Sequence, residues 1–212
     1  MSNPTLKFSP FGHWDAPSAR PLAIRWAIKM QKELIRLIEI AGAALEAEDR
    51  FFLGAVSANQ TAYPDEKGGI LRINNERYYQ FIVARALASS FPYAAAIEVE
   101  SHDLVLKYPN SDSNWFAVVE MKRWMSENGE QEIPGILRDI DKLRTSKADN
   151  ALMLVFSATP KNTTDTQLGW LSKRLGISQN EDCSAWKIYK FPTLNVSGVE
   201  VEFWVAGFQV KP

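Results

Sequence analysis

The stretch from Asp103 to Lys122, DLVLKYPNSDSNWFAVVEMK, predicts the centre of the fold. It begins with an apolar run, DLVL, and ends with a second one that leads into EMK. The PNSDSN segment between them is made of residues that favour turns, so the two runs are expected to pair as an antiparallel hairpin. Residues 116–119 are apolar at every position, which is typical of a central strand covered on both faces. The hairpin therefore predicts a sheet with helices on its two sides.

Working outward, residues 74–156 predict the order helix, strand, strand, strand, helix, strand. The first helix is expected to be capped by Asn74 or Asn75 and to end at Phe91–Pro92. The last three elements form a strand–helix–strand unit, which needs a crossover and gives a parallel pair. The two earlier connections are hairpins and give antiparallel pairs. The other expected elements of this region and beyond are strands at 94–101, 151–156, 186–191 and 199–210, and helices at 136–143 and 163–175. The predicted fold class is α/β, with a mixed central sheet flanked by helices.

The first 70 residues are predicted to be an arm and a helical extension packed on an α/β domain of residues 71–212. Residues 1–20 have the composition of an irregular arm, and residues 21–48 favour a long helix because they are rich in Ala, Leu, Ile, Lys and Glu and lack internal proline. Residues 51–58 are compatible with a strand or with a continuation of that helix.

The composition excludes several classes of protein. The chain has 212 residues, of which 46% are hydrophobic and 23% charged, so it is neither disordered nor collagen-like. Its net charge of −1 argues against a protein that coats nucleic acid through bulk charge. There is no apolar run of about 18 residues and no signal-peptide pattern, so we expect a cytoplasmic protein with no membrane partner. The single cysteine, Cys183, excludes an internal disulfide and a multi-cysteine zinc site.

Two carboxylates and one amine are expected to meet at one end of the hairpin. Side chains alternate along a strand, so Glu120 and Lys122 share a face, and Asp103 begins the neighbouring strand. Adjacent carboxylates repel one another unless a cation lies between them, and hard oxygen ligands suit Mg²⁺ or Mn²⁺. Lys122 would orient a water or stabilise charge on a phosphoryl oxygen. The plainer alternative is that Glu120 and Lys122 are surface residues at a strand end.

These residues in this order of elements resemble the PD-(D/E)xK nuclease superfamily, which includes many restriction endonucleases, resolvases and repair nucleases. The resemblance covers residues 74–156, and it implies a restriction-endonuclease-like core and divalent-metal-dependent hydrolysis of phosphodiester bonds in DNA. Asp103 and Glu120 would hold Mg²⁺ or Mn²⁺, and Lys122 would position the attacking water. Glu76 matches a further acidic residue on the first core helix, where it would be an accessory metal ligand, although a carboxylate there also stabilises the helix dipole.

The sequence departs from the family pattern at His102, which stands where a proline usually precedes the aspartate. By strand alternation His102 is expected to point away from Asp103 and to be exposed or satisfied elsewhere. Many members of the family act as dimers, and a homodimer would suit a duplex substrate, although nothing in the sequence requires one. The alternative function is a nuclease-fold protein without activity that binds nucleic acid or protein.

Three further features are candidates for contact with nucleic acid. Basic residues at helical spacing form one stripe on the first long helix: Arg25, Lys29, Lys32 and Arg36. The bland interpretation of that stripe is a solvated helix face. Arg138 and Lys142 form a shorter pair on the crossover helix. Trp124, just beyond Lys122, would either stack on a base or pack in the core.

Overall fold

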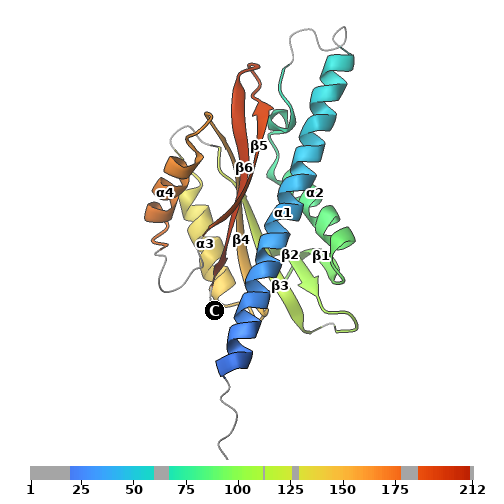
Figure 1. Cartoon of the computed structure of the whole chain (residues 1–212), viewed down its shortest axis with the longest axis vertical. Coiled ribbons are helices and arrows are strands. Elements are labelled where there is room, and N and C mark those ends of the chain that lie inside the picture. Colours follow the sequence, from blue (N-terminus) through green and yellow to red (C-terminus); the bar gives the residue numbers. More distant parts are fainter. Residues whose placement is uncertain (1–19, 60–66, 112, 126–128, 178–185, 211–212) are drawn as a thin grey trace, which may run out of the picture.

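A six-stranded mixed sheet lies between two pairs of helices (Figure 1). The computed structural model describes residues 20–59, 67–111, 113–125, 129–177 and 186–210, with side chains from residue 32 onward. The predicted irregular arm, apart from residue 20, and Cys183 lie outside the described residues. Within the described part of the chain, no helix is both long and apolar enough to cross a membrane.

The sheet has the strand order β1-β2-β3-β4-β6-β5. Its strands are β1 (Ala94–Val99), β2 (His102–Lys107), β3 (Trp115–Arg123), β4 (Asn150–Thr159), β5 (Lys187–Leu194) and β6 (Glu200–Val210). β3 and β4 are parallel, and the other neighbouring pairs are antiparallel. The predicted mixed sheet, its parallel pair and its two antiparallel hairpins are therefore confirmed.

Helices cover the two faces of the sheet in pairs. α1 (Arg20–Ala58) and α2 (Glu76–Ser90) pack on one face, with a short 3-10 turn, η1 (Ile70–Arg72), between them. α3 (Ile133–Arg144) and α4 (Thr164–Arg174) cover the other. Each face has its own core, because successive residues of β3 and β4 point to opposite sides. Val119 and Met121 belong to the α1/α2 core, whereas Val118 belongs to the α3/α4 core.

The predicted order of elements holds over residues 76–159. The α2 cap is Asn75, whose side chain accepts a hydrogen bond from the Arg77 backbone N–H at 3.0 Å. Residues 51–58, for which the sequence allowed either a strand or a continued helix, form the last part of α1, which ends at Ala58. α1 packs its residues Leu34, Leu37 and Ile38 into the same core as α2 and the sheet.

Two features of this fold place the candidate site. β3 and β4 run parallel, so their carboxyl ends meet at one edge, where Arg123 pairs with Phe156. The first turn of α2 lies at the same edge, because Glu76 accepts a hydrogen bond from the Arg123 backbone N–H at 2.8 Å. α3 follows β3 and crosses over the face that carries Glu120 and Lys122.

Candidate active site

Asp103 and Glu120 lie on neighbouring strands and on the same face of the sheet. β2 and β3 pair with Leu104 opposite Val119 and Val105 opposite Val118, and the same register places Asp103 opposite Glu120. Both residues alternate in step with Val105 and Val118, so they face α3. Asp103 Oδ2 accepts a hydrogen bond from the Met121 backbone N–H at 2.7 Å. The structure thus brings together the two carboxylates that the sequence predicted as a pair.

Glu120 is buried, and both of its carboxylate oxygens have partners. Its side chain is 1% exposed, with Oε1 2.6 Å from His102 Nδ1 and Oε2 2.7 Å from Lys142 Nζ. The pKa of Glu120 is raised to about 8, mainly by burial and also by the nearby charge of Asp103, against the opposing hydrogen bond and charge of Lys142. A buried carboxylate with a second one beside it is a place where positive charge is stabilised.

His102 is a satisfied histidine, one of the two outcomes expected from the sequence, and its partner is Glu120. Glu98, Glu100 and Ser101 have positive φ angles of 54°, 49° and 68° and form a tight connection before His102. The imidazole turns toward Glu120 and is buried. Burial and the charge of Lys142 lower the pKa of His102, which favours the neutral ring.

Lys142 enters the same cluster from α3. Besides Glu120, its ammonium donates a hydrogen bond to the Ser101 backbone carbonyl at 2.6 Å and lies 3.7 Å from Asp139 Oδ1. The sequence had suggested Lys142 as a contact to nucleic acid, whereas the structure shows it holding Glu120. The signal that could have found this role is the Asp139–Lys142 spacing on a helix that directly follows the candidate strand.

Lys122 lies next along the same face and is held by α2. Its ammonium is 3.0 Å from Glu76 Oε1, and Glu76 Oε2 binds the Arg123 backbone N–H. Burial acts to lower the pKa of Lys122, but the hydrogen bond and charge of Glu76 outweigh it, so the pKa is raised and the side chain stays an ammonium. A Cβ on Gly135 of α3 would come within 3.2 Å of Lys122 Cε, so the absence of a side chain there leaves room for the lysine.

The two central carboxylates have the right chemistry for a hard divalent cation. Burial raises the pKa of Asp103, opposed by the Met121 N–H and the charge of Lys142, so this carboxylate too lacks full compensation for its charge. Among the described residues, no three His, Cys, Asp or Glu side chains are grouped closely enough to hold a metal ion. Mg²⁺ is nevertheless often bound through one or two carboxylates, with water and substrate phosphate at the other positions. Asp103 and Glu120 have that donor chemistry, and a cation there would take the place of Lys142 on Glu120. Both oxygens of Glu76 hold the Lys122–Arg123 segment.

The other predicted nucleic-acid contacts are dispersed. Arg138 is exposed on α3, on the same side of the sheet as the carboxylates. Arg36 instead lies at the far end of α2 from Glu76, where it donates a hydrogen bond to the Ser90 carbonyl at 3.1 Å. A helix of 15 residues is about 22 Å long, so this part of the stripe is remote from the site. Lys32 is exposed, and the side chains of Arg25 and Lys29 lie outside the described residues.

Comparisons of the chain with family models, with curated proteins and with solved structures found no significant match. The functional argument therefore depends on the geometry of the residues themselves.

Proposed function

We propose that the protein is a divalent-metal-dependent nuclease of the PD-(D/E)xK type that hydrolyses phosphodiester bonds in DNA. The observation that carries the proposal is the cluster at the carboxyl end of β3. There, Asp103 and Glu120 are cross-strand partners, and Lys122 follows on the same face with its ammonium fixed by Glu76. The order of elements over residues 76–159, helix–strand–strand–strand–helix–strand, supports the same proposal.

Each residue has a distinct role in this proposal. Asp103 and Glu120 would hold Mg²⁺ or Mn²⁺, which neutralises phosphate charge and lowers the pKa of a water molecule. Lys122 orients the attacking water and stabilises the negative charge that develops on the phosphoryl oxygens. Glu76 is a positioning residue that keeps the lysine charged and aimed along the sheet face. The water adds to phosphorus, the bond to the leaving oxygen breaks, and that oxygen takes up a proton.

The proposal is tested by cleavage of supercoiled plasmid with Mg²⁺ or Mn²⁺. Wild type is expected to nick or linearise the plasmid, and Lys122→Ala and Asp103→Ala are expected to lose this activity. Lys147→Ala is the matched control, because Lys147 is an exposed lysine after the end of α3. Cleavage that survives both site substitutions would overturn the proposed site, and circular dichroism of each variant separates loss of chemistry from loss of folding.

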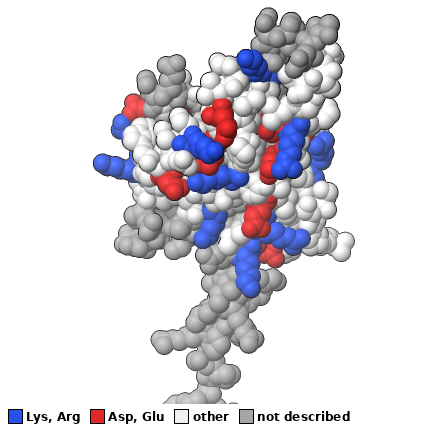
Figure 2. Space-filling view, turned by 45° about the horizontal axis from the view of Figure 1, so that its top comes forward, with Lys and Arg blue, Asp and Glu red and all other residues white. Residues whose placement is uncertain are grey.

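One observation favours a second candidate, an inactive nuclease-fold module that binds nucleic acid or protein. Lys142 already supplies a positive charge to Glu120, and a fixed lysine can satisfy such a carboxylate permanently. On the face seen in Figure 2, basic and acidic side chains are also intermingled over the described surface rather than separated into a basic region. Calorimetry with Mg²⁺ and Mn²⁺ distinguishes the two candidates, because the inactive module is expected to bind neither ion and to cut no DNA.

A further inference from the structure

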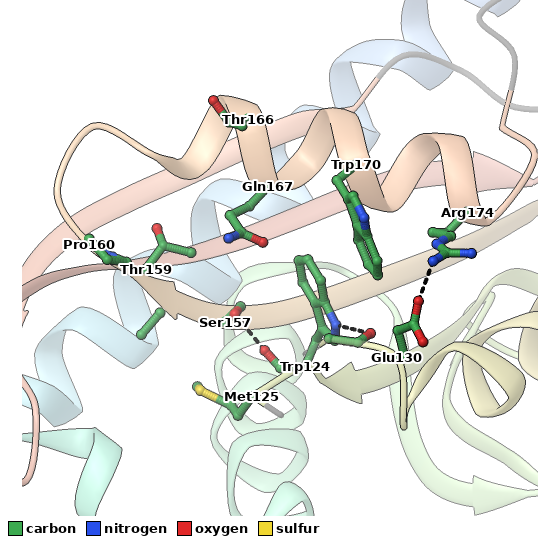
Figure 3. Close-up of a pocket in the computed structure, with 12 residues that line it drawn as sticks. Trp124, Met125, Glu130, Ser157, Thr159, Pro160, Thr166, Gln167, Trp170 and Arg174 are labelled. Carbon is green, nitrogen blue, oxygen red and sulfur yellow. Dashed lines mark hydrogen bonds and ion pairs between the residues drawn. The ribbon is translucent and has the colours of Figure 1, made fainter. Parts of the chain in front are cut away.

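A large pocket lies beside the candidate site. It has a volume of about 710 Å³ and is formed by the carboxyl end of β4, the segment that follows β3, and α4 (Figure 3). Pockets for small organic ligands usually have volumes of roughly 300–1,000 Å³. Ser157 and Thr159 come from β4, and Gln167 and Trp170 from α4, with Trp124 facing them. The pocket is therefore large enough for a bound group and is not part of the carboxylate cluster.

One wall of the pocket is a rigid pair of indole rings. Trp124 and Trp170 are nearly parallel, with ring centroids 5.8 Å apart and an interplanar angle of 7°. The Trp124 Nε1–H donates to the Gly129 carbonyl at 2.6 Å. Gly129 has a φ of 63°, and a Cβ there would come within 2.6 Å of the Trp124 ring, so glycine is required for this close approach. A fixed aromatic wall of this kind suits a planar ligand.

The polar groups of the pocket are neutral or already paired. Arg174 and Glu130, the two charged residues that line it, form an ion pair with each other (Figure 3). The side-chain amide of Gln167 makes no hydrogen bond to any described residue. Its NH₂ group can donate hydrogen bonds and its carbonyl oxygen can accept them. Glutamine amides pair with the donor and acceptor edge of a nucleobase. The lining thus favours an uncharged, planar ring with an amide-like edge over a phosphate.

The pocket is next to Lys122 along the chain and in space. Trp124 is the second residue after Lys122, a distance of about 6–7 Å along an extended chain. Its backbone N–H donates to the Phe156 carbonyl at 2.8 Å, and its carbonyl accepts from the Ser157 hydroxyl, so the segment stays anchored to β4. A nucleotide with its phosphate near Lys122 can therefore place its base in the pocket.

From these contacts we infer that the pocket receives one nucleobase of the substrate strand, turned out of its stack and held between the Trp124–Trp170 pair and the Gln167 amide. The inference rests on the proposed function and deepens it, because it assigns the pocket to the base that flanks the scissile phosphate. It also accounts for Trp124, for which the sequence left both base stacking and core packing open: the indole is packed, and it borders the pocket.

The test is a binding measurement without metal, so that it does not depend on cleavage. Deoxyadenosine 5′-monophosphate is titrated into the full chain while tryptophan fluorescence is followed, with deoxyribose 5-phosphate as the probe that lacks a base. The nucleotide is expected to bind saturably, and the base-free probe is not. Trp170→Leu is expected to weaken binding about tenfold, since the stacking of one base contributes roughly 1–3 kcal/mol. Gln167→Leu is expected to have a similar effect, since it removes the amide that pairs with the edge of the base. Lys173→Gln, on α4 but outside the pocket lining, is the matched control.

Equal binding of the two probes, or unchanged nucleotide binding in Gln167→Leu, would overturn the inference. Gln167 is a partly buried helix residue outside the hydrophobic cores, so its substitution keeps the test valid if Trp170→Leu fails to fold. The proposed function can fail separately from this inference. If nucleotide binding depends on Gln167 but the protein cuts no plasmid, the pocket is supported and the nuclease is rejected. Plasmid cleavage at the wild-type rate in Gln167→Leu, with no nucleotide binding by wild type, rejects the pocket and keeps the nuclease.

Discussion

Asp49 and Glu120 are both 1% exposed carboxylates, yet their surroundings differ completely. Asp49 lies in α1, where its Oδ1 accepts hydrogen bonds from the Ile70 backbone N–H at 2.8 Å and from the Thr193 hydroxyl. A Cβ on Gly69 would come within 1.9 Å of that oxygen, so the protein packs tightly around the carboxylate and leaves no space beside it on this side.

Glu120 has a cation and an imidazole as partners, and a second carboxylate stands opposite it. Burial raises the pKa of both acids, so a raised pKa alone does not distinguish them. The difference is in what surrounds the carboxylate. Asp49 in α1 accepts hydrogen bonds from η1 and β5 and so holds these three elements together, which is a structural role. Glu120 is placed with several charged groups on one sheet face, which is the arrangement that phosphoryl chemistry needs.

The largest expected difference in cleavage rate comes from replacing each buried carboxylate, Glu120 or Asp49, with the amide of the same shape. Glu120→Gln is expected to lower plasmid cleavage by at least about a thousandfold, because removing a group that stabilises the transition state through charge has effects of that order. Asp49→Asn is expected to leave the cleavage rate within about threefold, since Asp49 lies in α1, on the face of the sheet opposite the carboxylate pair. Initial rates with Mg²⁺ measure both variants. Equal losses in the two would mean that the comparison reflects folding rather than catalysis.

The next effect concerns Lys142, the cation in direct contact with Glu120. Lys142→Met leaves Glu120 buried without its ammonium partner, and we expect a loss of about 2–3 kcal/mol in the free energy of unfolding, at the low end for a broken buried pair because Lys142 is 28% exposed. Adding Mn²⁺ is expected to restore part of this loss, since a bound cation stabilises the folded state. Urea unfolding with and without Mn²⁺ measures both effects.

Arg138→Met is the control for Lys142→Met, because Arg138 is an exposed cation on the same helix. It is expected to change stability by less than about 0.5 kcal/mol, with no added response to Mn²⁺. If Mn²⁺ stabilises none of the three proteins, the carboxylate pair is not the cation site. Equal stabilisation of wild type, Lys142→Met and Arg138→Met would instead show that Lys142 does not compete with the ion for Glu120.

A smaller effect is expected from the acidity of Asp49. Burial raises the pKa of Asp49 above its ordinary value of 3.8, so its protonated form is favoured in the folded state. The corresponding stability is fully present below the unfolded pKa and is lost as pH rises through the folded pKa. Asn cannot ionise and keeps an oxygen acceptor, so Asp49→Asn is expected to gain stability relative to wild type as pH rises above about 4.

Thermal unfolding across the acidic range tests the Asp49 prediction. Asp165→Asn is the control, because the Asp165 side chain is 86% exposed. A stability difference between Asp49→Asn and wild type that does not change with pH would show that the carboxyl of Asp49 is not perturbed by burial.

The comparison also shows which parts of the molecule the sequence could predict. Local signals were sufficient for a helix cap at Asn74 or Asn75, for the turn between β2 and β3, and for the parallel pair that a crossover helix requires. Strand alternation and the hairpin were sufficient to place Asp103 opposite Glu120, because period and register are properties of neighbouring residues.

The remainder of the site depends on contacts between distant parts of the chain. The position of Lys142 against Glu120 requires the placement of α3 over the sheet, which no local pattern specifies. His102 follows three residues with positive φ angles, Glu98, Glu100 and Ser101, that composition does not predict. The pocket needs Gly129 and α4 to meet the end of β3, so only the folded chain shows that Trp124 borders a cavity.

The smallest effect compares two arginines that the sequence treated alike as contacts to DNA. Arg36 has partners in its own chain, the Ser90 carbonyl and the Phe91 ring at 4.7 Å, and it lies at the end of α2 remote from Glu76. Arg138 is exposed on the helix that covers the carboxylates. Arg138→Gln is therefore expected to weaken DNA binding a few-fold and to reduce the salt dependence of log K by about one phosphate contact, whereas Arg36→Gln changes neither and lowers stability by less than about 1 kcal/mol. Fluorescence anisotropy of a labelled duplex at several salt concentrations measures both slopes. If Arg36→Gln gave the larger change in slope, DNA would lie along α1, on the face of the sheet opposite the carboxylates, and the proposed site could not reach the phosphates it is meant to cut.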